Sequence, residues 1–162
     1  TSAEQRHGHR LVDQAGRLRG KIVTFKAHQG ERIVNVVDRS GNQRVRALTH
    51  TDFTYRGADG EIQRGPEVPV EIMSMFATAF SDSTVTPERI CPVGDDTVVI
   101  EFIGKGTNDG EFMGMAATGK PVELLVCTVL QFRDGALWSE HEYIDFATML
   151  RQLGALPALA AV

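Results

Sequence analysis

The stretch from Glu111 to Pro157 constrains the fold more than any other part of this chain. It contains two long strand-like segments that meet at Asp134-Gly135, a dipeptide that strongly favours a tight β-hairpin turn. A short segment from Phe146 to Leu153 follows and predicts a helix. The stretch therefore predicts an antiparallel hairpin with a helix directly after its second strand.

The two strands of this hairpin differ in polarity. The first is apolar on both faces in its middle, through Leu124, Val126 and Leu130 on one face and Leu125, Cys127 and Val129 on the other. This pattern predicts a strand covered on both sides, with Cys127 as a small buried side chain. In the second strand, Leu137 to Asp145, the two faces carry Ser139, His141, Tyr143 and Asp145, and Trp138, Glu140, Glu142 and Ile144.

The titratable side chains of this second strand need either water or partners. Burying a carboxylate or imidazole without partners costs on the order of several kcal/mol or shifts its pKa. The face with His141, Tyr143 and Asp145 therefore belongs either on the solvent side of the sheet or inside a wet, ligand-sized pocket. Glu140 and Glu142 are expected to face solvent or a partner subunit.

Composition bounds the class of protein. A chain of 162 residues with 42% hydrophobic residues fits one globular domain. The net charge of -4 argues against nucleic acid as a partner, and no apolar run approaches the ~18–20 residues of a membrane span. With two distant cysteines and a polar N-terminus that lacks a signal-peptide core, we expect a cytoplasmic protein with reduced thiols.

The remaining segments predict an α+β domain. Residues 1–20 are an extension, either a helical arm or a segment lying on a neighbouring subunit; 21–157 form the domain, and 158–162 are a tail. Within the domain we expect a helix over 21–37 (or a short strand over 21–26), then a helix over 42–50, a strand over 50–56 and a helix over 66–80. Strands over 84–89 and 97–103 then lead into the hairpin, as a four-stranded antiparallel meander. A sheet curved around helices leaves a cone, which favours the pocket for the His141, Tyr143 and Asp145 face.

Several segments resemble one known family when taken in order. They are AFSDSTVTPERI (79–90), GDDTVVIEF (94–102), GTNDGEFMGMAATGKPV (106–122), and FRDGAL followed by EYIDFATMLRQLGALP, up to Pro157. Together they resemble the SnoaL-like polyketide cyclases of the NTF2-like, ketosteroid-isomerase-like superfamily. The resemblance covers about Thr49 to Pro157. It departs from the family pattern at Asn108, where the family has a histidine, and at Gln131, where some cyclases place one.

The resemblance implies a cone-shaped α+β barrel that forms dimers or tetramers through its outer sheet face. It also implies a cyclase of the kind used in antibiotic biosynthesis, which closes a ring by an intramolecular aldol reaction without metal or cofactor. The general acid/base role carries over to Asp145, which by sequence alone is also a good N-cap for the helix at Phe146. The alternatives are isomerisation, hydrolytic or epoxide-opening chemistry, hydroxylation, or a small-molecule-binding domain without catalysis.

Other residues can be assigned around this acid. His141 and Tyr143 share the face of Asp145 and can support it or donate to a developing oxyanion, or can be ordinary residues of the wall and mouth. The histidine pair His7 and His9 is expected to be solvated, and no metal site is predicted. Candidate substrate-binding residues, each with a purely structural alternative, are Gln131, Asn108, His50, Tyr55, Met73, Phe76, Phe80, Met113 and Met115.

Overall fold

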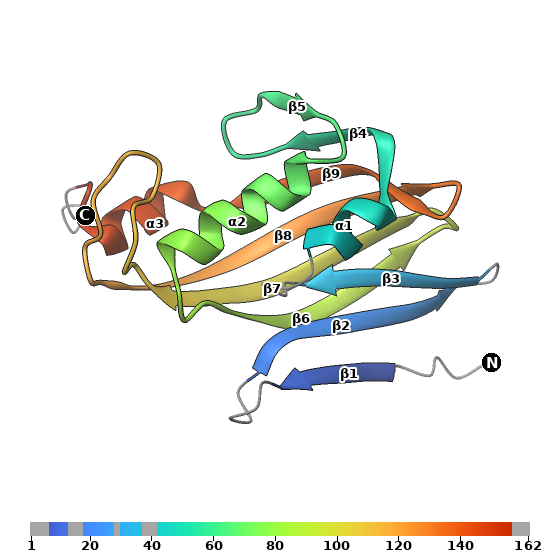
Figure 1. The fold of residues 1–162 in the computed structure, drawn as a ribbon, viewed down its shortest axis with the longest axis horizontal. Helices are drawn as coiled ribbons and strands as arrows, with labels where there is room; N and C mark the ends of the chain where they lie inside the picture. Colours follow the sequence, from blue (N-terminus) through green and yellow to red (C-terminus); the bar gives the residue numbers. More distant parts are fainter. Residues whose placement is uncertain (1–6, 13–17, 28–29, 37–41, 157–162) are drawn as a thin grey trace, which may run out of the picture.

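A six-stranded curved sheet forms the centre of the structure (Figure 1). The computed structural model describes residues 7–12, 18–27, 30–36 and 42–156, and side chains from Val45 onward. The sheet has the strand order β5-β4-β9-β8-β7-β6. Its strands are β4 (Thr49–Arg56), β5 (Ile62–Arg64), β6 (Thr84–Val93), β7 (Thr97–Thr107), β8 (Pro121–Arg133) and β9 (Ala136–Ile144).

The pairing confirms the predicted meander and adds one parallel contact. Strands β6 to β9 pair antiparallel in chain order, as expected from the turns between them. Strand β4 then joins β9 in parallel, and the short β5, which the sequence did not predict, closes the edge beside β4. The predicted turn at Asp134-Gly135 is present, with positive φ angles of 52° and 79° that suit an Asp-Gly pair.

Helices cover one face and one end of this sheet. Helix α1 (Asn42–Leu48) and helix α2 (Val68–Ala79) lie over the inner face, while α3 (Phe146–Leu153) follows β9 and packs against β8 (Figure 1). All three were predicted from the sequence, α3 with the same bounds. Helix α3 ends at Gly154, whose φ of 81° is the left-handed conformation that glycine adopts at helix C-termini.

The N-terminal segment is where the predicted helices are wrong. Residues 7–36 contain three antiparallel strands instead: β1 (His7–Val12), β2 (Leu18–Ala27) and β3 (Gly30–Val36), in a separate three-stranded sheet. Strand β2 lies beside β6. The alternative of a strand at Lys21–Lys26 was therefore the better interpretation. Its β-branched and aromatic residues favour an extended chain over the helical spacing that overlapped them. The predictions for 1–6 and 157–162 lie outside the described residues.

Strand β8 shows which face of the sheet is inside. Its even-numbered residues from Val122 to Phe132 are all buried, whereas Leu125 on the other face is 60% exposed. The expectation that β8 is covered on both faces is thus wrong in the single chain, and Cys127 is only half-buried on the outer face. Val122, Leu124 and Val126 of β8 pack with α2, α3 and Phe112 into the main core, and Leu130 and Phe132 pack with Val98 and Ile100 of β7 in a second cluster.

Candidate active site

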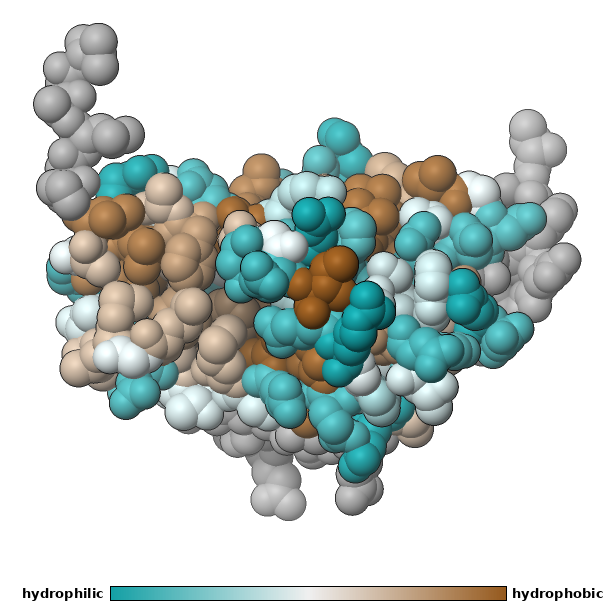
Figure 2. All heavy atoms as spheres, turned by 90° about the horizontal axis from the view of Figure 1, so that it is seen from above, coloured by the Kyte–Doolittle hydropathy of each residue, from teal (hydrophilic) through white to brown (hydrophobic). Residues whose placement is uncertain are grey.

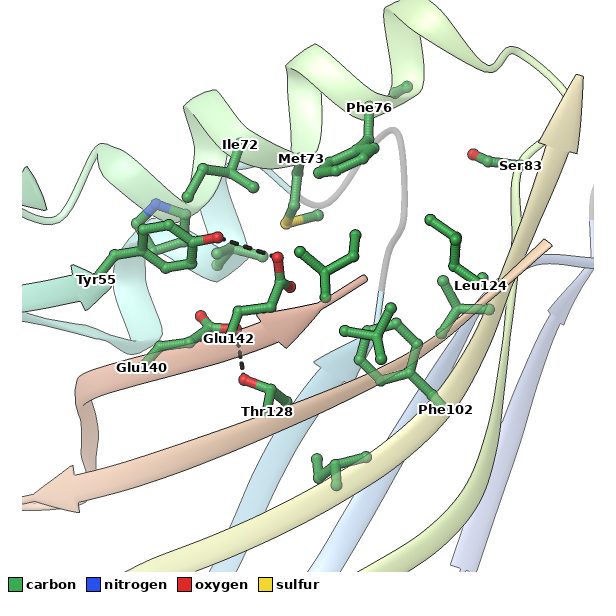
Figure 3. A pocket seen from close by; sticks show the side chains of 18 of the residues that line it. Tyr55, Ile72, Met73, Phe76, Ser83, Phe102, Leu124, Thr128, Glu140 and Glu142 are labelled. Carbon is green, nitrogen blue, oxygen red and sulfur yellow. Dashed lines mark hydrogen bonds between the residues drawn. The ribbon is translucent and has the colours of Figure 1, made fainter. Parts of the chain in front are cut away.

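A cavity of about 260 Å³ lies between the inner face of the sheet and helices α1 and α2 (Figure 3). Its wall is mostly hydrocarbon, from side chains that include Ile72, Met73 and Phe76 on α2 and Phe102 and Leu124 on the sheet. One end differs. There, four polar side chains project into the same space: Tyr55, Thr128, Glu140 and Glu142.

The side of the molecule seen in Figure 2 is mixed in polarity: hydrophobic residues gather at the left end, and hydrophilic residues dominate the middle. The cavity lining is more uniformly apolar, and a lining of this kind typically takes up an apolar small molecule.

A register shift in the β8–β9 hairpin determines which side chains of β9 enter the cavity. Next to the turn, Arg133 pairs with Ala136 and Phe132 with Leu137, but Gln131 pairs with Ser139, so β9 has one extra residue. Continued without this shift, the register would pair Thr128 with His141. With it, Thr128 pairs with Glu142. Because a one-residue slip moves every side chain of a strand to the other face, the bulge turns the two glutamates inward.

Glu142 is held by a tyrosine from the neighbouring strand. The Tyr55 hydroxyl on β4 donates a hydrogen bond of 3.0 Å to Glu142 Oε1. Burial raises the pKa of Glu142, and the bond from Tyr55, which favours the charged form, opposes this. Burial, with the Glu142 charge next in size, also raises the pKa of Tyr55 above its ordinary value. Tyr55 therefore keeps its proton and acts as a donor.

Glu140 lies two residues before Glu142 on β9, on the same inward face of the strand. Its Oε1 accepts a 3.0 Å hydrogen bond from the Thr128 hydroxyl. Burial, together with the nearby Glu142, raises the pKa of Glu140 to about 7, against a smaller opposing effect of the Thr128 bond. A carboxyl with this pKa exchanges its proton near neutral pH, which is where a general acid or base works best. The two glutamates thus place two carboxyl groups with raised pKa values at the polar end of the cavity.

The predicted location of Asp145, His141 and Tyr143 inside the cone is wrong. None of the three lines the apolar cavity; they border a separate polar surface pocket with Arg56, and Tyr143 is 62% exposed. Asp145 is exposed and caps α3: its Oδ2 accepts 2.6 Å from the Thr148 hydroxyl and its Oδ1 accepts 2.9 Å from the Thr148 amide. These bonds lower its pKa, the opposite of the raised value expected for a base in an apolar cone.

Four of the predicted substrate-binding residues do line the cavity: Tyr55, Met73, Phe76 and Phe80. The others do not. Gln131 lies at the outer side of β8, His50 accepts the Asp52 amide at 3.0 Å, and Met113 is 63% exposed in a turn. Met115 packs against the main core.

Asn108 is buried and has a structural role. Its Nδ2 donates to the carbonyl oxygens of Ala79 (3.2 Å) and Gly110 (2.9 Å), and its Oδ1 accepts from the amide and hydroxyl of Thr118 (2.8 and 3.0 Å). These four bonds use the whole hydrogen-bonding capacity of the amide. Asn108 therefore joins the end of α2 to the loop before β8 and leaves no group for a ligand.

Among the described residues, no group of three or more His, Cys, Asp or Glu side chains is placed to hold a metal ion. In the same part of the chain, every helix is too short or too polar to cross a membrane. What the cavity does hold is two glutamates in a wall that is mostly hydrocarbon. This combination fits an enzyme or binder of small molecules.

Comparison with known proteins assigns the family. The profile of the SnoaL-like polyketide cyclases matches residues 27–153, and the chain belongs to this family. No curated protein sequence matches the chain significantly.

Solved structures agree with this assignment. A candidate SnoaL-like polyketide cyclase from Jannaschia sp. CCS1 is 20% identical, with a TM-score of 0.68, 74% of this chain covered and 83% of that one. AclR, a candidate hydroxylase from Streptomyces galilaeus, is 25% identical (TM-score 0.64; 76% and 74% covered). IdmH, a candidate polyketide cyclase from Streptomyces antibioticus, is 30% identical (TM-score 0.59; 71% and 88% covered). A structure from Catenulispora acidiphila described as having a ketosteroid isomerase-like fold is also similar (23% identical, TM-score 0.59; 76% and 88% covered), so the fold expected from the sequence is confirmed.

Proposed function

We propose that this protein is a general acid/base enzyme that closes a ring, or isomerises a double bond, in an apolar polycyclic molecule. The observation that carries the proposal is the pair Glu140 and Glu142 at one end of a hydrocarbon cavity, with Tyr55 and Thr128 as hydrogen-bond donors. The acid/base role predicted for Asp145 thus passes to these two glutamates.

An aldol ring closure fits the different environments of the two carboxyls. Glu142, whose negative charge the Tyr55 hydroxyl stabilises, takes a proton from the carbon next to a ketone of the substrate. Glu140, with its raised pKa, gives its proton to the ketone oxygen, so an enol forms without a free negative charge.

The enol carbon then bonds to a second carbonyl carbon of the same molecule. The enol hydroxyl returns its proton to Glu140 as the first ketone re-forms. The new alkoxide takes the proton held by Glu142. Both carboxyls regain their starting states, and no atom is gained or lost.

Opening of an epoxide is the second candidate function. The same pair can protonate the epoxide oxygen and activate a water molecule, and one solved structure with this fold is described as an LEH-like epoxide hydrolase from M. tuberculosis (18% identical, TM-score 0.53; 70% and 74% covered). The reactions differ in their use of water. Reaction in H₂¹⁸O leaves one labelled oxygen in the product of epoxide opening and none from the catalysed step of an aldol closure, after control for carbonyl exchange.

Matched variants test the assignment of the acid/base pair. With partly cyclised aromatic polyketides as substrates, we expect Glu142→Gln and Glu140→Gln each to lower kcat by about 10²–10⁴-fold, since each removes one proton-transfer group. Asp145→Asn, which keeps an N-cap residue, is the control and should retain the wild-type kcat. Wild-type rates in both glutamine variants, with folding confirmed by circular dichroism, would contradict the proposal.

A further inference from the structure

Two inward positions of strand β7, Gly104 and Gly106, carry no side chain. The inner face of β7 presents Val98 and Ile100, both buried, then Phe102, and then Gly104. Among the described residues, no heavy atom lies within 4 Å of a Cβ atom built on Gly104, whereas most interior positions of a sheet are close-packed. Gly104 therefore borders unfilled space.

This space is part of the cavity. Gly104 pairs with Val85 on β6 and with Leu124 on β8, and all three residues line the cavity. The next inward glycine behaves differently. A Cβ on Gly106 would lie 3.0 Å from Phe80 Cβ and 3.3 Å from Ser83 Cα. Gly106 is thus needed for close packing, while Gly104 leaves room beside a ligand.

Gly104 also lies far from the acid/base pair. Glu142 pairs with Thr128 on β8, and Gly104 pairs with Leu124 of that strand. Four residues of strand separate the two levels by about 13 Å. Figure 3 shows the same arrangement: Tyr55, Glu140 and Glu142 lie at one end, and Leu124 and Ser83 lie toward the other.

The charge of the cavity wall restricts the ligand further. Lys105 is among the lining residues, but its ammonium group pairs with Glu123 at 2.8 Å on the outer face of the sheet. The side chains at the polar end offer hydroxyl and carboxyl groups. This set suits a neutral oxygen, such as a ketone or hydroxyl, and repels an anion.

We propose that the missing side chain at Gly104 lets the cavity accept a longer ligand than a larger residue at this position would allow. The ligand is then an uncharged, elongated, largely hydrocarbon molecule whose oxygen lies at the Glu140–Glu142 end and whose far end lies over Gly104. The inference rests on the proposed function only in that the cavity binds the substrate. It adds the substrate's shape and the residue that limits it.

A series of n-alkanols from butanol to dodecanol tests this limit, with binding measured by calorimetry. Each buried methylene should raise affinity roughly fourfold until the chain fills the cavity. In Gly104→Val and Gly104→Leu, we expect affinity to stop rising at shorter alcohols than in the wild type. The limit should be shorter for leucine than for valine, because the leucine side chain is larger. Val99→Leu adds bulk to the other face of the same strand and should keep the wild-type limit.

Stability gives a second readout. Glycine weakens a strand interior, so Gly104→Ala and Gly104→Val should raise Tm if the space is open. An equal limiting length in wild type and Gly104→Leu, or a lower Tm for Gly104→Ala, would overturn the proposal, as would failure of the wild type to bind any alkanol. If the acid/base function alone were wrong, the glutamine variants would keep their rates while the length limit still moved with residue 104.

Discussion

The Tyr55 hydroxyl lies 3.0 Å from Glu142 Oε1, although the two residues are 87 positions apart in the chain. The parallel pairing of β4 with β9 brings them together, since Tyr55 is the register partner of Glu140, two residues before Glu142. This hydrogen bond favours the charged form of Glu142 against the larger effect of burial, and it orients the oxygen that accepts a proton in the proposed reaction.

Gly57 allows the Tyr55 ring to take this position. A Cβ on Gly57 would lie 2.9 Å from Tyr55 Oη and 3.0 Å from its Cε1. The φ of Gly57 lies outside the left-handed range, so Gly57→Ala changes sterics and not backbone strain. We expect Gly57→Ala to move the phenol away from Glu142 and to lower kcat more than it changes KM.

The ionisation of Tyr55 reports this displacement without a substrate. The chain has two tyrosines, so Tyr143→Phe leaves Tyr55 as the only one. Burial and Glu142 raise the pKa of Tyr55, and Gly57→Ala should bring its ultraviolet titration to lower pH in that background. An unchanged titration would show that the ring has not moved.

The sequence predicted the fold well because its signals are local. The Asp-Gly turn, the apolar run of β8 and the capped segment at Phe146 each specify one element. The N-terminal strands were missed because an apolar spacing compatible with a helix coincided with β-branched residues. Which of two competing periods a segment adopts depends on tertiary contacts that periodicity does not contain.

The site was misplaced for a different reason. Alternation shows that β9 has two faces, and both carry titratable groups. The register shift at Gln131 and Phe132 decides which face is inside, and no residue pattern marks it. One signal was available: Thr128 is the lone hydroxyl on the otherwise apolar inner face of β8, which suggests a polar partner across the cavity.

Glu140 should make the protein less stable as the pH rises. Its pKa is 4.5 in an open chain and about 7 in the folded protein. The folded state therefore holds this proton over a range where the unfolded state has lost it, and stability falls between these two pH values. The difference between the two pKa values corresponds to a loss of about 3 kcal/mol in the free energy of unfolding once the pH is well above both.

Glu140→Gln, a neutral isostere of the protonated acid, should remove this dependence. We expect its free energy of unfolding in urea to match that of the wild type near pH 4.5 and to exceed it increasingly up to pH 8. Glu111→Gln, at an exposed position, controls for the loss of one negative charge. A constant difference between Glu140→Gln and wild type across this range would contradict the coupling.

Asp145 should act on stability and not on turnover. Its bonds to Thr148 lower its pKa, so its stabilising effect is present above the ordinary pKa of an aspartate and is lost as pH falls through the lowered value. Asp145→Ala should lower Tm at pH 7 and leave kcat unchanged, whereas Asp145→Ser, which can still cap α3, should recover most of the Tm. Loss of turnover in both folded variants would restore the catalytic role expected from the sequence.

Asn108 should be among the most sensitive positions outside the cavity. Asn108→Ala leaves the Gly110 carbonyl and the Thr118 amide without this partner, and it removes one of three donors to the Ala79 carbonyl, which still accepts from the Asp109 and Gly110 amides. Each unsatisfied buried group of this kind costs roughly 1–3 kcal/mol. We therefore expect the free energy of unfolding in urea to fall by about 2–4 kcal/mol. Thr118→Val removes the hydroxyl that donates to Asn108 Oδ1 and accepts from the exposed Lys120 amide at 3.3 Å, and it should cost about 1 kcal/mol. In the double variant, the loss of stability should be smaller than the sum of the two single losses, because the Thr118 hydroxyl has already lost its acceptor.

Because Asn108 lies outside the cavity wall, the folded Asn108→Ala variant should bind alkanols as the wild type does. A changed length limit in this variant would show that the loop before β8 shapes the cavity.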